Sequence, residues 1–321
     1  AYDCNFRCPY CFESELSNKG LSWSGKTMTK EMVDHAYGAI ESMEPDVNKC
    51  KTIGLYGGEP LLERNIEIVN YIVNKGVAKG HNFHAVTNGY DLNHFIGLLS
   101  ENKINQLQIT LDGPSQYHDK RRYLFDGSGT FQRITENITI ALNQGVKISV
   151  RINSDQSAIH ELEELSQFFE KNNWLTHRNF HASVAPIKEL NILQEKNDIA
   201  FKNRSSFINS FLKKKSTNHI KGVEVSDLGI ISKFKYVLAT GKLIPFKSAF
   251  CGANTGMFLF DPFGDIYPCW DVVGQEYGKI GRYSPHLKIN HESYNNWYGR
   301  NISTSEKCHK CKYAFYCGGG C

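Results

Sequence analysis

Hydrophobic and polar positions along the chain follow two periods, one typical of amphipathic helices and one typical of buried strands. Segments with apolar residues at three- and four-residue steps alternate with short apolar runs over residues 30–187. The predicted helices are 30–43, 63–76, 92–101, 130–145 and 158–172, and the predicted strands are 51–58, 81–89, 104–113, 146–153 and 179–187. Because the loops between them are short, the strands are expected to be parallel with right-handed crossovers. A sixth strand is expected before residue 4.

Local signals mark where these elements begin and end. Thr29 is a candidate N-cap for the first helix, and Gly145 is a candidate C-cap for the fourth. The ends of the strands are polar or glycine-rich, at 57–59, 87–89, 112–113 and Asn153. In barrel-like α/β folds the C-terminal strand ends form the active face. The sequence therefore predicts an α/β fold, a partial (β/α)6 TIM-like barrel, with its site at those ends.

The remaining chain has a different texture. Residues 190–245 are expected to be mainly helical, and after Phe250 short segments rich in aromatic residues, Gly and Cys follow. Residues 256–270 predict a hairpin around the Asp-Pro-Phe-Gly turn at 261–264. These changes place domain limits at 1–190 for the barrel, 191–247 for a helical bridging segment and 248–321 for a small Cys-rich domain.

Composition is that of an ordinary soluble globular protein. The chain has 321 residues, 40% of them hydrophobic, and a formal net charge of +4. The lysine run at 213–215 is typical of a solvated helix end, so no nucleic-acid partner is expected. No apolar run approaches the ~18 residues of a membrane span, and no signal-peptide pattern opens the chain. We expect a cytoplasmic protein without a membrane partner.

The chain has ten cysteines, and their positions are more informative than their number. Three lie within residues 4–11 and six within residues 251–321, and only Cys50 stands apart, as expected of a buried reduced thiol. A disulfide scaffold would spread its cysteines through a short secreted chain. Two dense groups separated by a long interval are instead typical of metal or cluster ligands.

The stretch CNFRCPYCFE, residues 4–13, admits three interpretations. The tetrapeptide Cys-Pro-Tyr-Cys matches a glutaredoxin-like dithiol, which has no need of Cys4. Three cysteines without a nearby His would need a distant fourth ligand to close a structural zinc site. Three thiolates can also hold three irons of a [4Fe–4S] cluster, leaving the fourth iron open to a small molecule. The last interpretation fits the spacing best.

The C-x3-C-x2-C spacing of Cys4, Cys8 and Cys11, with the aromatic Tyr10, resembles the signature of radical S-adenosylmethionine (SAM) enzymes. The resemblance implies that the three thiolates hold a [4Fe–4S] cluster. It extends to the turn Gly57, Gly58, Glu59 and Pro60, which in that family presents backbone groups to the amino group of SAM. The segment ITLDGPSQYHDKRR (109–122) resembles a strand that reaches the ribose. Arg151 would pair with the methionine carboxylate of SAM. Strand-end capping is the competing interpretation for Thr110 and Asp112, and a structural ion pair is the competing interpretation for Arg151. The implied cofactor contacts are Tyr10, Gly57, Gly58, Glu59, Pro60, Thr110, Asp112 and Arg151.

The C-terminal cysteines resemble the SPASM domain, which holds auxiliary [4Fe–4S] clusters in radical SAM enzymes that modify peptides and proteins. A zinc module on the last four cysteines is the alternative. The resemblance implies one cluster on Cys251, Cys269 and Cys321 and a second on Cys308, Cys311 and Cys317. The pattern calls for one more Cys, so the domain is expected to continue beyond residue 321; a substitute ligand for the second cluster is the alternative.

The resemblance also implies the reaction. The reduced cluster would cleave SAM to methionine and a 5′-deoxyadenosyl radical, which abstracts hydrogen from a ribosomally made peptide to form a thioether or carbon–carbon crosslink. One alternative is an anaerobic sulfatase-maturing enzyme that makes formylglycine; another is a non-catalytic iron–sulfur electron-transfer protein. Formylglycine enzymes place an Asp directly after the cysteine equivalent to Cys269. Here Trp270 takes that position, and Asp271 is a candidate base, with a solvated carboxylate as the alternative. The implied partners are a precursor peptide or protein and a flavodoxin- or ferredoxin-like reductant.

Overall fold

The structure is a computed structural model that describes residues 2–11, 13, 24–44, 46, 51–155, 158–186, 197–225 and 230–321. Cys50 lies outside the described residues. The chain forms two compact units, one of Ala1–Gly25 with Cys50–Asp227 and one of Lys26–Lys49 with Leu228–Cys321. The predicted domain limits at 190 and 247 stay a prediction.

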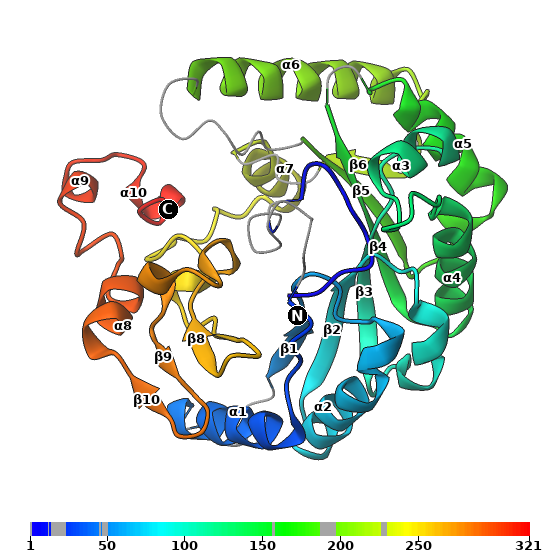
Figure 1. Cartoon of the computed structure of the whole chain (residues 1–321). Helices are drawn as coiled ribbons and strands as arrows, with labels where there is room; N and C mark the ends of the chain where they lie inside the picture. Colours follow the sequence, from blue (N-terminus) through cyan, green and yellow to red (C-terminus); the bar gives the residue numbers. More distant parts are fainter. Residues whose placement is uncertain are drawn as a thin grey trace. The chain divides into compact units, whose positions relative to one another are not determined.

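The first unit is built on one parallel sheet. Its strands are β1 (Thr52–Leu55), β2 (Asn82–Thr87), β3 (Ile104–Thr110), β4 (Lys147–Ser154), β5 (Phe180–Pro186) and β6 (Val223–Val225). They lie in chain order, and every neighbouring pair is parallel (Figure 1). The predicted α/β fold and its five predicted strands are confirmed.

The sixth strand of this sheet is β6, inside the stretch expected to be mainly helical. That stretch also contains α6 (Asn197–Ser216) and α7 (Ile230–Thr240), with β6 between them. Three residues are too short a run for the two-residue period to be visible in the sequence. The sheet consequently continues past residue 190.

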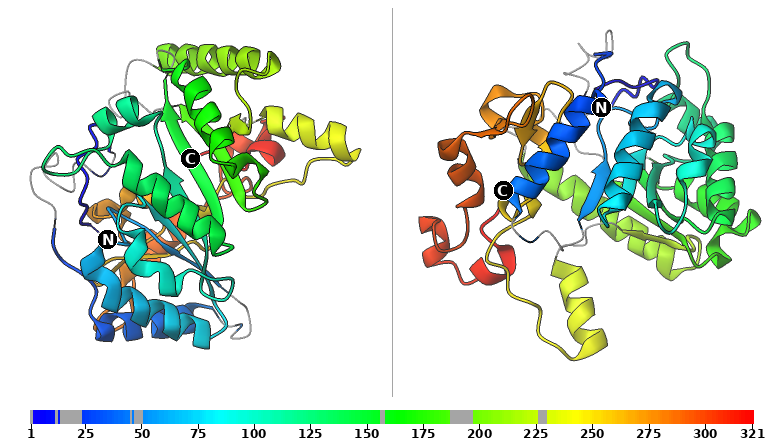
Figure 2. Two further views of the ribbon diagram at one scale, coloured as in Figure 1. Left: turned by 90° about the vertical axis from the view of Figure 1, so that its right-hand side faces the viewer. Right: turned by 90° about the horizontal axis from the view of Figure 1, so that it is seen from below.

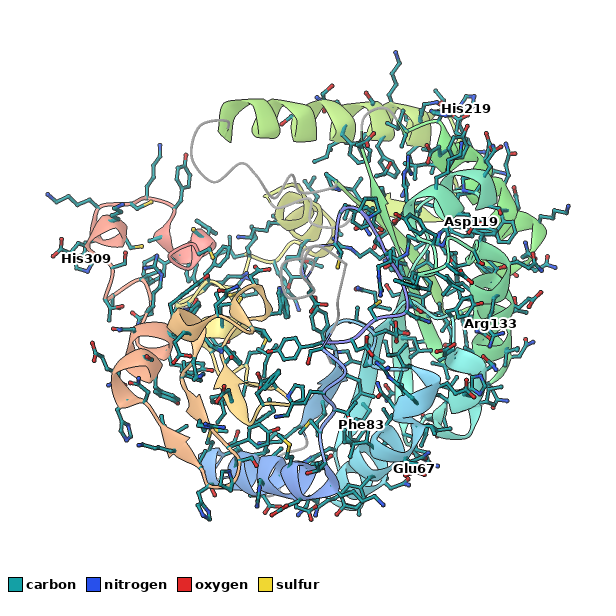
Figure 3. The ribbon with its side chains drawn as sticks, in the orientation of Figure 1. Glu67, Phe83, Asp119, Arg133, His219 and His309 are labelled. Atoms are coloured by element: carbon teal, nitrogen blue, oxygen red, sulfur yellow. The ribbon has the colours of Figure 1, made fainter. Side chains whose placement is uncertain are left out.

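Helices pack against one face of the sheet. They are α2 (Ile66–Ala78), α4 (Phe131–Asn143), α5 (Glu161–Lys171) and α6, with 3-10 turns at Glu63–Asn65, Leu92–Leu98 and Trp174–Thr176. Figure 2 shows α2, α4 and α5 running along the strands. Alternate strand residues point into the core between the layers, as Phe83 does where β2 meets α2 (Figure 3). Phe83, Ile109 and Val150 are fully buried there.

A further helix, α3 (Ser115–Arg121), was not predicted. Its Asp119 lies beside the start of α4 (Figure 3). The Asp119 carboxylate accepts hydrogen bonds from the backbone N–H of Thr130, at 2.7 Å, and of Phe131, at 2.9 Å. A capping carboxylate compensates the unpaired N–H groups of a helix start. The short helix thereby fixes the loop between β3 and α4.

The other face of the sheet is polar. Apart from Val86 and Ala185, the side chains that alternate with the core positions on β2 to β6 are polar and half-buried or exposed, and they are His84, Gln106, Gln108, Ser149, Arg151, Asn153, His181, Ser183 and Glu224. A sheet buried on both faces would show continuous apolar runs. This sheet keeps hydrogen-bonding groups on the face opposite the helices.

The second unit contains α1 (Lys30–Met43) and a four-stranded antiparallel sheet of β7 (Leu259–Phe260), β8 (Asp265–Tyr267), β9 (Gly281–Arg282) and β10 (Lys288–Ile289). The predicted hairpin is confirmed, since Leu259 pairs with Tyr267. The Thr29 hydroxyl caps α1 by accepting from the N–H of Met32. Ala36 and Ala39 of α1 share a core with Ile266, Ile280 and Tyr283. The tail adds α8 (His291–Tyr298), α9 (Glu306–His309) and α10 (Ala314–Cys317), and 3-10 turns at Gly252–Asn254, Trp270–Val272 and Glu276–Gly278.

Within the described residues, no helix is both long and apolar enough to span a membrane.

Candidate functional site

The first cysteine loop is anchored on the segment that follows α3. Phe6 forms an antiparallel bridge with Leu124, and the N–H of Phe125 donates to the carbonyl of Asn5 at 3.1 Å. Inside the loop, the N–H of Cys11 donates to the carbonyl of Cys8 at 3.2 Å. Cys4, Cys8 and Cys11 are half-buried free thiols on this fixed loop.

The glycine turn after β1 docks against the same loop. The N–H of Glu59 donates to the carbonyl of Asp3 at 2.6 Å, and Asp3 also pairs with Arg64. A Cβ on Gly58 would lie 2.3 Å from the Asp3 carbonyl oxygen, and Gly57 has a φ of 109°. Both glycines are therefore required by the backbone, one for close approach and one for its conformation.

The Glu59 carboxylate is used inside the protein. It is 1% exposed and accepts hydrogen bonds from the Thr87 hydroxyl (2.7 Å) and from the backbone N–H of Asn88 (2.5 Å) and Leu61 (2.8 Å). Burial raises the pKa of Glu59 to about 7, while these donors act in the opposite direction. Glu59 thus fixes the turn, and its carboxylate is fully used by donors within the protein.

A second connection joins β2 to the cysteine loop. The Asn88 side-chain amide donates to the Asn5 side-chain oxygen at 2.8 Å. Thr87 and Asn88 stood out in the sequence only as a polar strand end, and nothing in the sequence indicated their partners.

Asp112 is the centre of a network at the ends of β3 and β4. Its carboxylate accepts from the Tyr10 hydroxyl and from the backbone N–H of Asn153, at 2.8 Å. The Asn153 side-chain oxygen in turn accepts from Nε of Arg151 at 3.0 Å, and Thr110 lies buried beside Arg151 in the strand register. Burial raises the pKa of Asp112, and the nearby arginines lower it. The predicted Tyr10, Thr110, Asp112 and Arg151 are therefore brought together.

Arg151 carries a charge that no carboxylate neutralises among the described residues, where it forms no ion pair. The competing interpretation of a structural ion pair is not supported there. Asp112, in contrast, already uses both carboxylate oxygens within the protein.

Sequence reasoning missed the two arginines at the C-terminal end of α3, Arg121 and Arg122. Arg121 pairs with Glu161 through two hydrogen bonds, of 2.7 and 2.9 Å, and donates to the Asp112 carbonyl at 2.8 Å. Arg122 donates to the Tyr10 hydroxyl at 2.9 Å. Burial opposes the charge of Arg122, but Tyr10, Cys8 and Asp112 hold its pKa well above the ordinary value.

The three thiols can be compared with a cluster's requirements. Burial raises the pKa of Cys4, Cys8 and Cys11, that of Cys11 to about 11, and Arg122 lowers all three. Cluster ligation needs thiolates, so binding would release protons and would favour a nearby fixed cation. Three free thiols on one anchored loop beside a buried guanidinium fit a cluster of the [4Fe–4S] type.

The tail cysteines form a second candidate set. Burial raises the pKa of Cys269; the Asp271 backbone lowers it, and the charges of Asp271, Cys251 and Cys321 raise it. Cys251 and Cys321 therefore both lie within electrostatic reach of Cys269. The Asp271 side chain is exposed, as is Trp270 at 46%.

The other tail cysteines follow one another closely. The N–H of Cys311 donates to the Cys308 carbonyl at 3.1 Å, and Cys317 ends α10. In the described part of the chain, no three Cys, His, Asp or Glu side chains converge on a single metal ion. A [4Fe–4S] cluster takes each protein ligand on a different iron, so its thiols stand further apart than those of a mononuclear site.

Comparison with known proteins identifies the first part of the chain. Residues 1–155 match the family described as the Radical SAM superfamily. The chain carries a radical SAM domain. Radical SAM domains use a [4Fe–4S] cluster and SAM, and they belong to enzymes.

Curated relatives extend over nearly the whole chain. A cysteine-type anaerobic sulfatase-maturating enzyme of Clostridium novyi (strain NT) is 23% identical over 99% of this chain and 85% of its own length. The enzyme of the same name from Clostridium perfringens (strain 13 / Type A) is also 23% identical, over the same shares.

Solved structures agree on the fold. Native anSMEcpe with bound AdoMet matches with a TM-score of 0.71 and 18% identity, over 100% of this chain and 87% of that chain. Streptococcus suis SuiB bound to precursor peptide SuiA matches with a TM-score of 0.66 and 18% identity, over 100% of this chain and 70% of that chain. The radical SAM fold predicted from the sequence is confirmed.

Proposed function

We propose that this radical SAM enzyme removes a hydrogen atom from a residue of a peptide or protein substrate and forms a thioether or carbon–carbon crosslink. The observation that carries the proposal is the network that ties the cysteine loop to the strand ends, through Asp3 with Glu59 and through Tyr10 with Asp112. A non-catalytic electron carrier has no use for this connection, because it needs no small-molecule site beside its cluster.

Each part of the site has a role in this proposal. Cys4, Cys8 and Cys11 would hold the cluster that, when bound, supplies the electron for reductive cleavage of SAM. The backbone of Gly57–Pro60 would receive the SAM ammonium, and Arg151 would pair with the carboxylate through charge-assisted hydrogen bonds. Thr110 lies on the next strand, where it would approach the ribose.

The tail would carry auxiliary clusters. We assign Cys251, Cys269 and Cys321 to one and Cys308, Cys311 and Cys317 to the other, as a SPASM domain would. The electrostatic proximity of the first three supports the first assignment. These clusters would accept the substrate electron or ligate a substrate thiolate. A small flavodoxin- or ferredoxin-like protein would act as the reductant.

A peptide substrate is supported by two of the matched structures, each of which contains a peptide: anSMEcpe with Kp18Cys and SuiB with SuiA. The polar face of the sheet adds a physical reason, because backbone amides and polar side chains of an extended peptide need hydrogen-bonding partners when they leave water.

Formation of formylglycine is the second candidate. The relatives that cover 99% of the chain are cysteine-type sulfatase-maturating enzymes, which favours it. Against it stands Trp270 at the position after Cys269, with Asp271 exposed one residue further. Asp271 would serve as the base only if its carboxylate reaches the substrate.

The experiment is anaerobic reconstitution followed by mass spectrometry. The reduced protein should release 5′-deoxyadenosine from SAM, and Cys8→Ala should abolish this release. A peptide that loses two hydrogens and its free thiol supports a thioether, whereas replacement of a cysteine thiol by an aldehyde supports formylglycine. Retained release in Cys8→Ala would refute the assignment of the loop.

A further inference from the structure

Arg122 is the most enclosed cation of the candidate site. Its residue is 9% exposed, its guanidinium carbon lies 5.5 Å from the ring centre of Phe6, and one terminal nitrogen donates to Tyr10. Its Nε is buried and has no hydrogen-bond partner among the described residues. A buried charged donor without a partner is costly, and such groups in native proteins call for a functional explanation.

The backbone holds Arg122 in place from both sides. Its N–H donates to the His118 carbonyl at 2.7 Å, and its carbonyl accepts from the Thr130 hydroxyl, also at 2.7 Å. The His118 ring joins the same hydroxyl, at 3.1 Å, to the backbone N–H of Asp112, at 3.2 Å. Because Nδ1 accepts from Asp112, Nε2 carries the proton and donates to Thr130.

His118 stays neutral in this position. It is fully buried, and burial together with Arg122 and Arg121 holds its pKa well below the ordinary value. An uncharged imidazole therefore couples the backbone of Asp112 rigidly to that of Arg122. These bonds fix the backbone position from which the Arg122 side chain extends, and the guanidinium itself is held by Tyr10 and the Phe6 ring.

Arg122 contacts the cysteine loop on both sides of Cys8. Its guanidinium carbon lies 5.5 Å from the ring centre of Phe6, and one terminal nitrogen donates to the Tyr10 hydroxyl at 2.9 Å. Arg7, the cation within the loop, donates instead to the carbonyls of Cys4 and Phe6.

We propose that Arg122 is the internal counter-ion of the SAM-binding cluster, with its Nε–H reserved for a thiolate or sulfide acceptor. This inference rests on the proposed function, in which Cys4, Cys8 and Cys11 hold that cluster. A fixed positive charge stabilises the reduced state, which carries one more negative charge, more than the oxidised state. Arg122 thereby raises the reduction potential of this cluster.

The test is an EPR-monitored redox titration of the full chain, with wild type, Arg122→Gln and Arg133→Gln compared. Arg133, on α4 (Figure 3), is the matched control: it donates to the Tyr90 carbonyl and the Asn93 side chain, and its guanidinium lies 4.8 Å from a tyrosine ring centre. The signal followed is the component that changes when SAM is added. Arg122→Gln should lower the reduction potential of this component by at least about 59 mV, which is a tenfold change in the equilibrium constant of a one-electron reduction. Arg133→Gln should leave it unchanged.

An unchanged potential in iron-loaded Arg122→Gln overturns the proposal. If Arg122→Gln fails to load iron in the cysteine loop, Arg122→Lys is measured next. A counter-ion role requires that Arg122→Lys recovers iron loading and has a reduction potential nearer to that of the wild type. Failure of Arg122→Lys to load iron refutes the counter-ion role. If no component responds to SAM, the proposed function fails. The potential of the loop cluster is then obtained by subtracting the Cys8→Ala spectrum, so the two failures are distinguished.

Discussion

The contact between the glycine turn and the cysteine loop makes Gly58→Ala the most informative single substitution. The added Cβ would lie 2.3 Å from the carbonyl oxygen of Asp3 and 2.8 Å from its carbonyl carbon. Both atoms belong to the backbone, so no side-chain rotation relieves the overlap. The turn and the loop must move apart.

The cost follows from two contributions. Overpacking of this kind costs about 1–3 kcal/mol. The separation also weakens the 2.6 Å hydrogen bond from Glu59 N–H to the Asp3 carbonyl, worth roughly 0.5–1.5 kcal/mol. We expect a loss of about 2 kcal/mol or more, which lowers the melting temperature of a unit of this size by about 4–8 °C.

The assay compares thermal unfolding of the apo protein, anaerobic and reduced, with SAM affinity of the reconstituted protein. Gly97→Ala is the matched control, because Gly97 is exposed in the Leu92–Leu98 turn and an added Cβ meets nothing within 4 Å. Gly58→Ala should lower the melting temperature and weaken SAM binding at least tenfold; Gly97→Ala should do neither. Equal behaviour of the two variants would show that the turn does not depend on this contact.

Three further predictions test other parts of the structure. Burial raises the pKa of Glu59 to about 7, so the protonated side chain favours the folded state below the unfolded-state pKa of 4.5, and the free energy of unfolding falls by about 3 kcal/mol as the pH rises to 7. Glu59→Gln should remove this dependence of the unfolding free energy on pH, measured by urea unfolding of the apo protein at pH 5–8. The same pH dependence in both proteins would contradict the prediction. Glu161→Gln leaves Arg121 without its carboxylate partner, so the urea midpoint should fall by the equivalent of about 3 kcal/mol, and a change below about 0.5 kcal/mol would show the pair to be dispensable. Cys269→Ala should reduce iron from about twelve to about eight per chain with 5′-deoxyadenosine release retained, whereas unchanged iron content would remove Cys269 from the ligands.

Long helices and strands were predictable because many residues in each follow the same hydrophobic periodicity. The helices at 131–143 and 161–171 and the strands at 104–110 and 147–154 lie within or close to their predicted ranges. Short elements were not, and β6 and α3 were both missed. Three or seven residues give too little pattern, and their conformation is decided by tertiary partners such as the start of α4.

The candidate site was predictable in its residue types but not in its connections. Spacing and resemblance indicated the cysteines, the glycine turn and Asp112. The partners of these residues are set by the packing of distant segments: Asp3 approaches Gly58, Tyr10 reaches Asp112, and Arg122 inserts beside Tyr10. A sequence alone does not record such approaches, and an arginine in a polar stretch gives no sign that it will be buried.

The alternation along the parallel sheet has a consequence for how such a protein can change. One set of strand positions holds the core, and the intervening set, which includes Gln106, Gln108, Ser149 and Ser183, points to the opposite face. Substitutions in the second set need not disturb the packing of the first. Natural or directed evolution can therefore change the side chains of that face, and with them the ligand specificity, while the free energy of unfolding stays nearly unchanged.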